Sequence, residues 1–188
     1  MADVVLLNSG GIDSRVSAAM LVASGMTVHS LFLDWAPGGR RRFRAAAHRT
    51  ALLYAATHVE FRYPVNWMTH SERLGRVRMP FAVFAAVALG AQYAASLGAG
   101  WVATGRRFQS LEVPDGSTDQ MQEVLNQSRV SDKLVLLNPV FAMDDDAVDA
   151  KARELGVDLT GSASCLEPTP CGACPDCRRR KRFNYEAG

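Results

Sequence analysis

The sequence predicts an α/β fold in which a doubly wound, mostly parallel β-sheet is followed by a cysteine-rich segment at the carboxyl terminus. Short apolar runs rich in valine and leucine alternate with longer helical patterns, which is typical of βαβ units. A chain of 188 residues with 48% hydrophobic side chains can bury one sizeable core. The alternation stops near residue 161, where a segment rich in Cys, Pro and Arg begins. We therefore expect an α/β domain over residues 1–160 and a small module packed on it over residues 161–188.

The first half of the chain is expected to supply three strands and two helices. The run Val4–Leu7 is short and apolar, as in a strand that is buried on both faces. A glycine turn follows it, and Gly25 marks the end of the first helix. The elements expected after this strand are a helix over Ser14–Ser24, a strand over Thr27–Leu33, a helix over Phe43–Ala56 and a strand over Val59–Tyr63.

The second half continues the same alternation. The longest helix is expected over Met79–Leu97, because that segment is almost free of charge and is followed by Gly98. The elements expected after it are a strand over Trp101–Thr104, a helix over Asp119–Ser128, a strand over Leu134–Leu137 and a helix over Asp144–Leu155. Right-handed crossovers between parallel strands place helices on both faces of the sheet, so the expected fold is Rossmann-like, with ligands beyond the carboxyl ends of the strands.

The composition excludes several classes of protein. No window approaches the roughly 18 uninterrupted apolar residues that span a bilayer, and Asp3 stands where a signal peptide carries Lys or Arg. A soluble, cytoplasmic protein with no membrane partner is therefore expected. Residues 1–100 contain 10 Arg and only 5 acidic residues, so the amino-terminal half is the side that attracts anions.

The first motif is NSGGIDS, residues 8–14, between the first expected strand and the first expected helix. Gly10 and Gly11 let backbone N–H groups approach an anion, and the hydroxyls of Ser9 and Ser14 can donate further hydrogen bonds. The segment fits neither the Walker pattern nor the dinucleotide fingerprint. A Gly-Gly pair alone also fits an ordinary strand-to-helix turn, but the full string predicts a phosphate cradle.

The string SGGIDS, residues 9–14, resembles the pyrophosphate loop of the ATP-pyrophosphatase superfamily. Members of this superfamily cleave ATP between the α and β phosphates and activate a substrate oxygen as an adenylate. The resemblance implies the adenine nucleotide alpha hydrolase-like form of the α/β fold, with ATP and Mg²⁺ as cofactors. It implies that Asp13 and Ser14 take part in catalysis and that Asp13 reaches toward Mg²⁺. The residues expected on the nucleotide are Ser9, Gly10, Gly11, Asp13, Ser14, Asp34 and Gly105.

The second motif is a cluster of all four cysteines, spaced C-x5-C-x2-C-x2-C: Cys165, Cys171, Cys174 and Cys177. Four thiolates at this spacing can close a tetrahedral shell around Zn²⁺. The alternatives are a disulfide pair or inert thiols, and a cytoplasmic compartment disfavours disulfides. Zinc with four protein ligands has no open position for water, so we expect it to hold the tail and not to catalyse. Sulfur transfer is disfavoured, because no cysteine is left to carry a persulfide.

The two motifs together resemble one branch of that superfamily, the 7-cyano-7-deazaguanine synthases (QueC). The matching strings are SGGIDS near the start and Cys165-Leu166 with CGACPDCRRR near the end, supported by FLDW with GGRR, Arg78, ATG at residues 103–105 and Pro114-Asp115. Such enzymes adenylate the carboxylate of 7-carboxy-7-deazaguanine, let ammonia displace AMP to give an amide, and then activate that amide again to give the nitrile. The resemblance thus implies an ATP-dependent carbon–nitrogen ligase, a small deazapurine substrate, ammonia and a homodimer.

The resemblance also suggests residues for the substrate. Arg78 and Asp115 are expected to bind it, and Trp35 could stack on its flat base. Arg78 and Arg41 are expected to act in catalysis, because an arginine can neutralise phosphate charge or hold a carboxylate with a bidentate fork. A solvated helix start is the alternative for the arginines at 40–44. The basic run 178–182 is interpreted as a solvated helix end, and a nucleic-acid partner is not expected.

Several positions depart from the family pattern. Gly116 and Ser117 stand where the family has Cys-Arg, Met79 stands where it has Asn, and Asp145 stands near a family Lys. Two alternatives to nitrile synthesis therefore stay open. In the first, the enzyme joins a carboxy-deazapurine to another amine, for example on a protein, and stops at the amide. In the second, the chain is a noncatalytic nucleotide-binding module that serves as an interaction partner.

Overall fold

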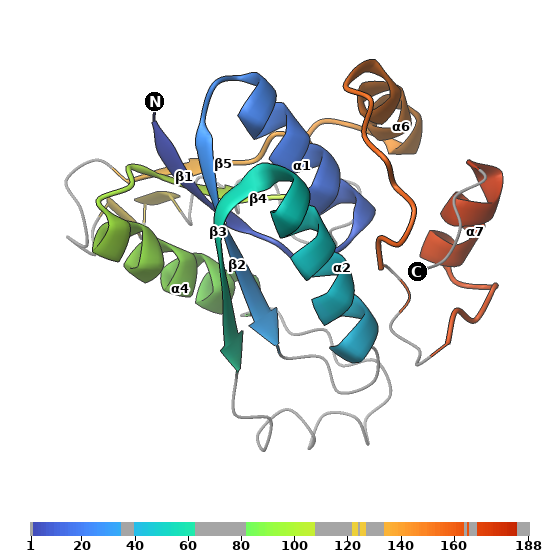
Figure 1. Cartoon of the computed structure of the whole chain (residues 1–188), viewed down its shortest axis with the longest axis horizontal. Coiled ribbons are helices and arrows are strands. Elements are labelled where there is room, and N and C mark those ends of the chain that lie inside the picture. Colours follow the sequence, from blue (N-terminus) through green and yellow to red (C-terminus); the bar gives the residue numbers. More distant parts are fainter. Residues whose placement is uncertain are drawn as a thin grey trace.

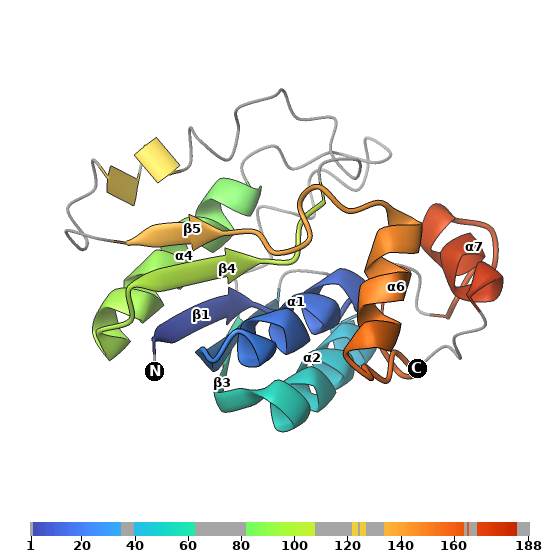
Figure 2. The same ribbon diagram turned by 90° about the horizontal axis from the view of Figure 1, so that it is seen from above.

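The computed structural model describes residues 2–34, 40–62, 82–107, 122–123, 125–126, 134–163, 165 and 169–183. Within these ranges, one five-stranded sheet carries helices on both faces (Figures 1 and 2). The strands are β1 (Asp3–Leu7), β2 (Thr27–Asp34), β3 (Ala55–Arg62), β4 (Trp101–Thr104) and β5 (Val135–Leu137). The helices are α1 (Ile12–Ala23), α2 (Arg40–Tyr54), α4 (Ala82–Leu97), α6 (Asp145–Glu154) and α7 (Pro175–Arg182).

The sheet has the order β3-β2-β1-β4-β5, and every described pair of neighbouring strands is parallel. The chain leaves β1 toward β2 and β3, and it returns on the other side of β1 at β4 and β5. This reversal is a topological switch point, where the connections that follow β1 and β4 diverge and leave room for a ligand. The prediction of a doubly wound parallel sheet is confirmed.

Alternating side chains of the strands assign one helix layer to each face. Val5 and Val102 pack with Val87 of α4, whereas Val4 and Ala103 pack with Leu21 of α1 on the opposite face. Figures 1 and 2 show the same division, with α4 on one side of the sheet and α1 and α2 on the other. Because both faces are covered, the central strands are apolar throughout, which is the pattern that predicted them.

The boundaries of two elements differ from the prediction. Helix α2 begins at Arg40, earlier than expected, and ends at Tyr54, so residues 55–56, expected at the end of the helix, belong to β3. Strand β3 therefore begins before the expected Val59 and pairs in parallel with β2, with Ala55 opposite Val28 and Thr57 opposite His29. Tertiary pairing therefore overrides the helical pattern of the alanine-rich sequence. The expected helix over Asp119–Ser128 and the start of the one over Met79–Leu97 lie largely outside the described residues.

The last two helices have clear start signals. Asp144 caps α6, because its Oδ1 accepts a hydrogen bond from the Ala147 N–H at 2.8 Å. Helix α7 begins with Pro175 directly after Cys174, whose sulfur accepts a hydrogen bond from the Cys177 N–H. None of the helices within the described ranges is long and apolar enough to cross a membrane.

Candidate functional site

The glycine-rich loop connects β1 to α1 at the switch point. Gly11 is the N-cap residue of α1, and no side chain caps this end of the helix, so N–H groups of its first turn remain available to an anion. The hydroxyls of Ser9 and Ser14 lie 2.7 Å apart across the loop. Ser9 is exposed while Ser14 is buried, so the pair extends from solvent to the base of the loop. The arrangement has the donors and the helix terminus that a phosphate cradle requires.

Close backbone packing fixes this loop on two sides. Gly10 has a φ of +75°, and a Cβ there would lie 2.5 Å from the Phe43 carbonyl oxygen of α2. A Cβ on Gly105, directly after β4, would lie 2.6 Å from both the nitrogen and the Cα of Ser14. Neither position has room for a side chain. Gly105 thus holds the end of β4 against α1, and its expected contact with the nucleotide stays a prediction.

Asn8 anchors the loop to the sheet and to α2. Its side chain is buried, and its Oδ1 accepts a hydrogen bond from the Gly10 N–H at 3.0 Å. Its Nδ2 donates to Ser30 Oγ and to the Ala47 carbonyl oxygen, each at 2.9 Å. Ser30 Oγ in turn lies 2.9 Å from His58 Nδ1. A continuous chain of hydrogen bonds therefore runs from the loop to a titratable side chain on β3.

Four charged side chains from four parts of the chain meet beside the loop. Arg107 donates from Nε to Asp13 Oδ2 at 2.9 Å and from Nη1 to Asp145 Oδ1 at 2.5 Å. Arg179 of α7 donates from Nη1 to Asp13 Oδ1 at 2.8 Å, and its Nε lies 3.1 Å from Asp145 Oδ1. Sequence reasoning missed Arg107 and Arg179, although the two arginines that follow ATG were a usable signal. We call these four residues the ion-pair cluster.

The surroundings of the loop carry additional positive charge. Burial lowers the pKa of Arg106, and its Nε is buried with no hydrogen-bond partner in the described part of the chain. Burial also lowers the pKa of Arg180, with further contributions from the charges of Arg42 and other neighbours. Burial disfavours the charged form of both guanidinium groups, and a bound anion would stabilise that charged form. Arg106 and Arg180 were not singled out by sequence as anion ligands.

The structure describes only some of the remaining residues that are predicted to bind the nucleotide or the substrate. Asp34, at the carboxyl end of β2, is 6% exposed, and its Oδ2 lies 4.0 Å from Arg62 Nε. Arg41 is exposed in the first turn of α2. Trp35, Arg78 and Asp115 lie outside the described residues. The structure thus brings the loop residues and Gly105 together and leaves the substrate residues as predictions.

The four cysteines meet in space as their spacing predicted. The sulfur atoms of Cys165, Cys171, Cys174 and Cys177 all lie within 4.8 Å of one another, and none of these cysteines forms a disulfide. Tetrahedral zinc–thiolate geometry requires sulfur atoms about 3.8 Å apart, given Zn–S bonds of about 2.3 Å. The sulfurs of Cys171 and Cys177 are 3.9 Å apart. The donor set and its dimensions therefore fit a zinc ion.

Local hydrogen bonds prepare these sulfurs for a cation. Backbone N–H groups of Ala173 and Cys174 donate to Cys171 and lower the pKa of its thiol to about 6. At Cys174 the Cys177 N–H acts in the same direction, but burial and neighbouring sulfurs outweigh it and raise the pKa to about 12. Without a cation, the thiolate form is thus favoured at Cys171 and disfavoured at the neighbouring Cys174. A bound dication would favour the thiolate form at both positions.

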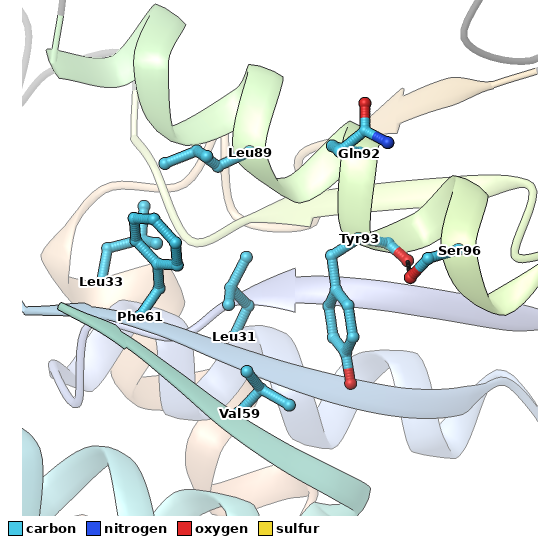
Figure 3. A pocket seen from close by; sticks show the side chains of 8 residues that line it. All are labelled: Leu31, Leu33, Val59, Phe61, Leu89, Gln92, Tyr93 and Ser96. Atoms are coloured by element: carbon cyan, nitrogen blue, oxygen red, sulfur yellow. Dashed lines mark hydrogen bonds between the residues drawn. The ribbon is translucent and has the colours of Figure 1, made fainter. Parts of the chain in front are cut away.

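An apolar pocket of about 280 Å³ lies elsewhere, between α4 and the outer two strands β2 and β3. Figure 3 shows Leu89 and Tyr93 of α4 facing Leu31, Val59 and Phe61 of the strands. Its lining contains no charged side chain, so it offers nothing to neutralise a phosphate. This pocket is therefore separate from the loop at the switch point.

A family model and the relatives found by sequence comparison point to the same family. The model of the family described as "Queuosine biosynthesis protein QueC" matches residues 66–187. The "7-cyano-7-deazaguanine synthase 1" of Sphingopyxis alaskensis is 27% identical over 98% of this chain and 94% of its own length. The "7-cyano-7-deazaguanine synthase" of Erythrobacter litoralis is 26% identical over 97% of this chain and 88% of its own length.

Solved structures agree on the fold. The U34-tRNA thiolase NcsA of Methanococcus maripaludis has a TM-score of 0.61 and 16% identity, covering 97% of this chain and 63% of its own. The NH3-dependent NAD synthetase of Campylobacter jejuni has a TM-score of 0.55 and 19% identity, covering 82% of this chain and 64% of its own. These neighbours confirm the predicted α/β fold. Because the family model spans more than half of the sequence, the chain belongs to the QueC family of queuosine biosynthesis proteins.

Proposed function

We propose that this protein is an ATP-dependent carbon–nitrogen ligase that adenylates the carboxylate of 7-carboxy-7-deazaguanine and adds ammonia to give first the amide and then the nitrile. The observation that carries the proposal is the loop at the switch point, where Ser9, Ser14 and the uncapped start of α1 converge. Membership of the QueC family supports the substrate class. Four described arginines near the loop suit a reaction in which the nucleotide and the carboxylate substrate are both anions: Arg106, Arg107, Arg179 and Arg180.

The chemistry requires activation because a carboxylate is a poor electrophile whose leaving group would be oxide. Attack of the substrate carboxylate oxygen on the α-phosphorus of ATP forms the P–O bond of the adenylate and releases pyrophosphate. Ammonia then forms the C–N bond, and AMP leaves with the carboxylate oxygen. The N–H groups at the start of α1 and the Ser14 hydroxyl would stabilise the departing pyrophosphate. Attack of the amide oxygen on a second ATP would release pyrophosphate. Departure of AMP with that oxygen, and loss of both nitrogen-bound protons, would then give the nitrile.

Two metal ions accompany this proposal. Magnesium would neutralise phosphate charge, held mainly by the phosphate oxygens of ATP, because both Asp13 oxygens already accept from arginines. We propose that Asp13 acts chiefly by keeping Arg107 and Arg179 in position. Zinc would fill the four-cysteine site, closing residues 161–188 into a structural module on the domain of residues 1–160.

Arg106 is the described side chain best suited to a second anion, the substrate carboxylate. It directly follows Gly105, whose backbone packs on Ser14, so it lies next to the phosphate loop. Its buried Nε has no partner in the described ranges. A half-buried guanidinium in this state would gain a hydrogen-bonded ion pair from a bound carboxylate. Arg41, Arg78, Asp115 and Trp35 remain proposed contributors from the family resemblance.

One observation favours an enzyme that stops at the amide. Asp145, which stands near a family lysine, pairs with Arg107 and Arg179 in the ion-pair cluster. The charge beside the loop is therefore arranged differently from the family pattern. A changed arrangement would matter most for the second activation, in which the weakly nucleophilic amide oxygen is the attacking group. In this alternative a carboxy-deazapurine is joined to another amine, for example on a protein.

Mass spectrometry of a defined reaction tests these readings. The zinc-loaded protein is incubated with MgATP, 7-carboxy-7-deazaguanine and ammonium, and the molecular masses of the products are measured. Nitrile together with AMP supports the proposal, whereas AMP with amide alone supports the alternative. A protein that forms no AMP from these substrates would contradict both.

Matched serine variants at the two ends of α1 make the test specific: Ser14 in its first turn and the C-cap residue Ser24. Ser14→Ala removes the buried hydroxyl of the loop and is expected to abolish most AMP formation. Ser24→Ala removes a hydroxyl at the opposite end of the same helix, where it only donates to the Leu21 carbonyl oxygen. AMP formation by the Ser24 variant should match that of the unmodified protein. Sedimentation velocity would test the homodimer that the resemblance implies.

A further inference from the structure

The four-cysteine site is built into the start of α7. Cys174 is the N-cap residue of this helix and Cys177 lies in its first turn. Hydrogen bonds from backbone N–H groups to sulfur tie this turn together, from Cys174 to Cys171 at 3.3 Å and from Cys177 to Cys174 at 3.4 Å. A metal bound to these sulfurs would therefore fix where α7 begins and in which direction its side chains point.

The next turn of α7 reaches the nucleotide loop. Arg179, whose side chain is 5% exposed, contacts Asp13 in the first turn of α1 and Asp145 in the first turn of α6. Figure 2 shows α7 beside the amino-terminal part of α6. Its neighbour Arg180 donates to the carbonyl oxygen and the hydroxyl of Ser162. One short helix thus connects the cysteines to the helix that carries the phosphate cradle.

Burial makes the Arg179 contact consequential. Without the buried Arg179, the carboxylates of Asp13 and Asp145 would share the single guanidinium of Arg107, which costs more than the loss of a fully exposed pair does. Without Arg179, Asp13 would keep Arg107 but lose its second guanidinium, and Asp145 would also lose a partner. The first turn of α1 would then be held less firmly in the geometry that presents its N–H groups.

Within the described residues, the tail also contacts the loop through a backbone hydrogen bond that is not made by α7. The Ala163 N–H donates to the Gly10 carbonyl oxygen at 2.8 Å. This bond does not involve Arg179, although Arg180 of α7 contacts the preceding residue, Ser162. The two routes can therefore be separated by changing Arg179 alone.

We propose that Arg179 is a positioning residue that couples metal binding at the four cysteines to nucleotide binding at the loop. The proposal rests on the proposed function, because it requires that the loop bind a nucleotide. Metal orders the start of α7, α7 sets Arg179, and Arg179 holds Asp13 and the first turn of α1. Thermodynamic coupling is reciprocal, so bound nucleotide must tighten metal binding by the same factor.

The experiment measures the affinity for a nonhydrolysable MgATP analogue by calorimetry, with and without zinc. Zinc is removed with a chelator, which gel filtration then removes, and circular dichroism checks that the α/β core remains folded. Typical coupling between sites changes affinity about 5- to 150-fold, and we expect zinc removal to weaken analogue binding by on the order of tenfold. In Arg179→Gln the zinc-loaded protein should bind about as weakly, and zinc removal should change little more.

A matched control lies on the same helix. Arg182 also pairs with an aspartate of α6, Asp146, at 2.7 Å, but this pair is exposed and does not contact the loop. Arg182→Gln should retain the full dependence of analogue affinity on zinc. Arg179→Lys keeps the charge but cannot bridge two carboxylates, so it should give an intermediate dependence. The lysine variant also serves if Arg179→Gln does not fold.

The outcomes separate this proposal from the proposed function. If the zinc-loaded, unmodified protein binds no analogue, the proposed function fails. If it binds the analogue equally well with and without zinc, or if Arg179→Gln keeps the dependence, the coupling through Arg179 is wrong. Competition with a zinc-binding dye adds a test on the unmodified protein, because the analogue must raise zinc affinity. Loss of the α/β core on zinc removal would also overturn the proposal, since the metal would then support the whole fold.

Discussion

Gly105 packs directly on the backbone of Ser14. A Cβ at position 105 would lie 2.6 Å from both the nitrogen and the Cα of Ser14, and 2.9 Å from the carbonyl carbon of Asp13. These atoms belong to the first turn of α1, so they cannot move without moving the end of the helix that forms the phosphate cradle. This packing therefore fixes the position of the carboxyl end of β4 relative to the loop after β1.

Gly105→Ala should therefore displace the first turn of α1. Misplacement of a reacting group by about 1 Å can lower a rate on the order of a hundredfold, and we expect a loss of AMP formation of that size. Gly90→Ala is the control, because its Cβ would meet only side-chain atoms of Leu7 and Val102 at 3.0 and 3.1 Å. Steady-state AMP formation by both variants checks this, and equal losses would contradict it.

Gly10 and Gly25 offer a matched comparison of stability. Both have positive φ, +75° and +82°, but a Cβ on Gly10 would lie 2.5 Å from the Phe43 carbonyl oxygen, whereas Gly25 has nothing within 4 Å. Gly25→Ala should lower the free energy of unfolding by about 1–2 kcal/mol through its backbone conformation alone. Gly10→Ala adds overpacking, which costs about 1–3 kcal/mol more. Urea unfolding measures the free energy of unfolding of both variants. Equal losses would show that α2 shifts to make room for the methyl group at position 10.

The fold was predictable because its signals are local. Apolar runs such as Val4–Leu7 are buried on both faces, and glycines such as Gly25 end helices, so the alternation itself specifies a parallel sheet. The strand residues 55–58 were not predictable, because their pairing with β2 is a tertiary interaction that the alanine-rich sequence does not show.

The site was predictable where a motif is contiguous. The loop and the four cysteines lie within short segments whose spacing carries the chemistry. The ion-pair cluster has no such signature, because Arg107 and Arg179 are 94 and 166 residues from Asp13. Pro175 after Cys174 was an available signal for the start of α7, which contains the basic run 178–182. Arg179 and Arg180 are in fact buried, while Arg182 is exposed.

His58 gives the protein a pH-dependent stability. Its pKa lies below the ordinary value of 6.5, mainly because burial disfavours the imidazolium, with Glu60 acting in the opposite direction. The unfolded chain then binds more protons near pH 6, so this stability is complete above about pH 6.5 and is lost as the pH falls toward the lower, folded pKa. We expect the Tm to fall between about pH 7 and about pH 5.5.

His58→Asn isolates this effect. An asparagine can keep a hydrogen bond to Ser30 Oγ, which His58 contacts through Nδ1, but it does not titrate. The pH dependence of Tm in this window should become flatter, while Glu60, whose pKa is lowered chiefly by its hydrogen bond with Arg44, still titrates at lower pH. An unchanged slope in the variant would assign the effect to other groups.

Metal binding by the four cysteines should release protons. In the metal-free cluster the pKa of Cys171 is about 6 and that of Cys174 is about 12, so near neutral pH at least the Cys174 thiol is protonated. Zinc binds thiolates, so binding must displace these protons and the apparent affinity must fall as the pH falls. Calorimetry in buffers with different ionisation enthalpies counts the protons released, and cobalt substitution reports tetrahedral thiolate coordination by its absorption bands.

Variants distinguish this site from inert thiols. The unmodified protein should bind one zinc ion per chain, and Cys171→Ser should lower the affinity strongly because a three-thiolate site is incomplete. Arg178→Ala is the control, since it removes only a hydrogen bond from Nη1 to the Ala173 carbonyl oxygen and leaves all four sulfurs in place. Should Cys171→Ser bind zinc as tightly as Arg178→Ala does, Cys171 cannot be a ligand, and the proximity of its sulfur to that of Cys177 would reflect packing alone.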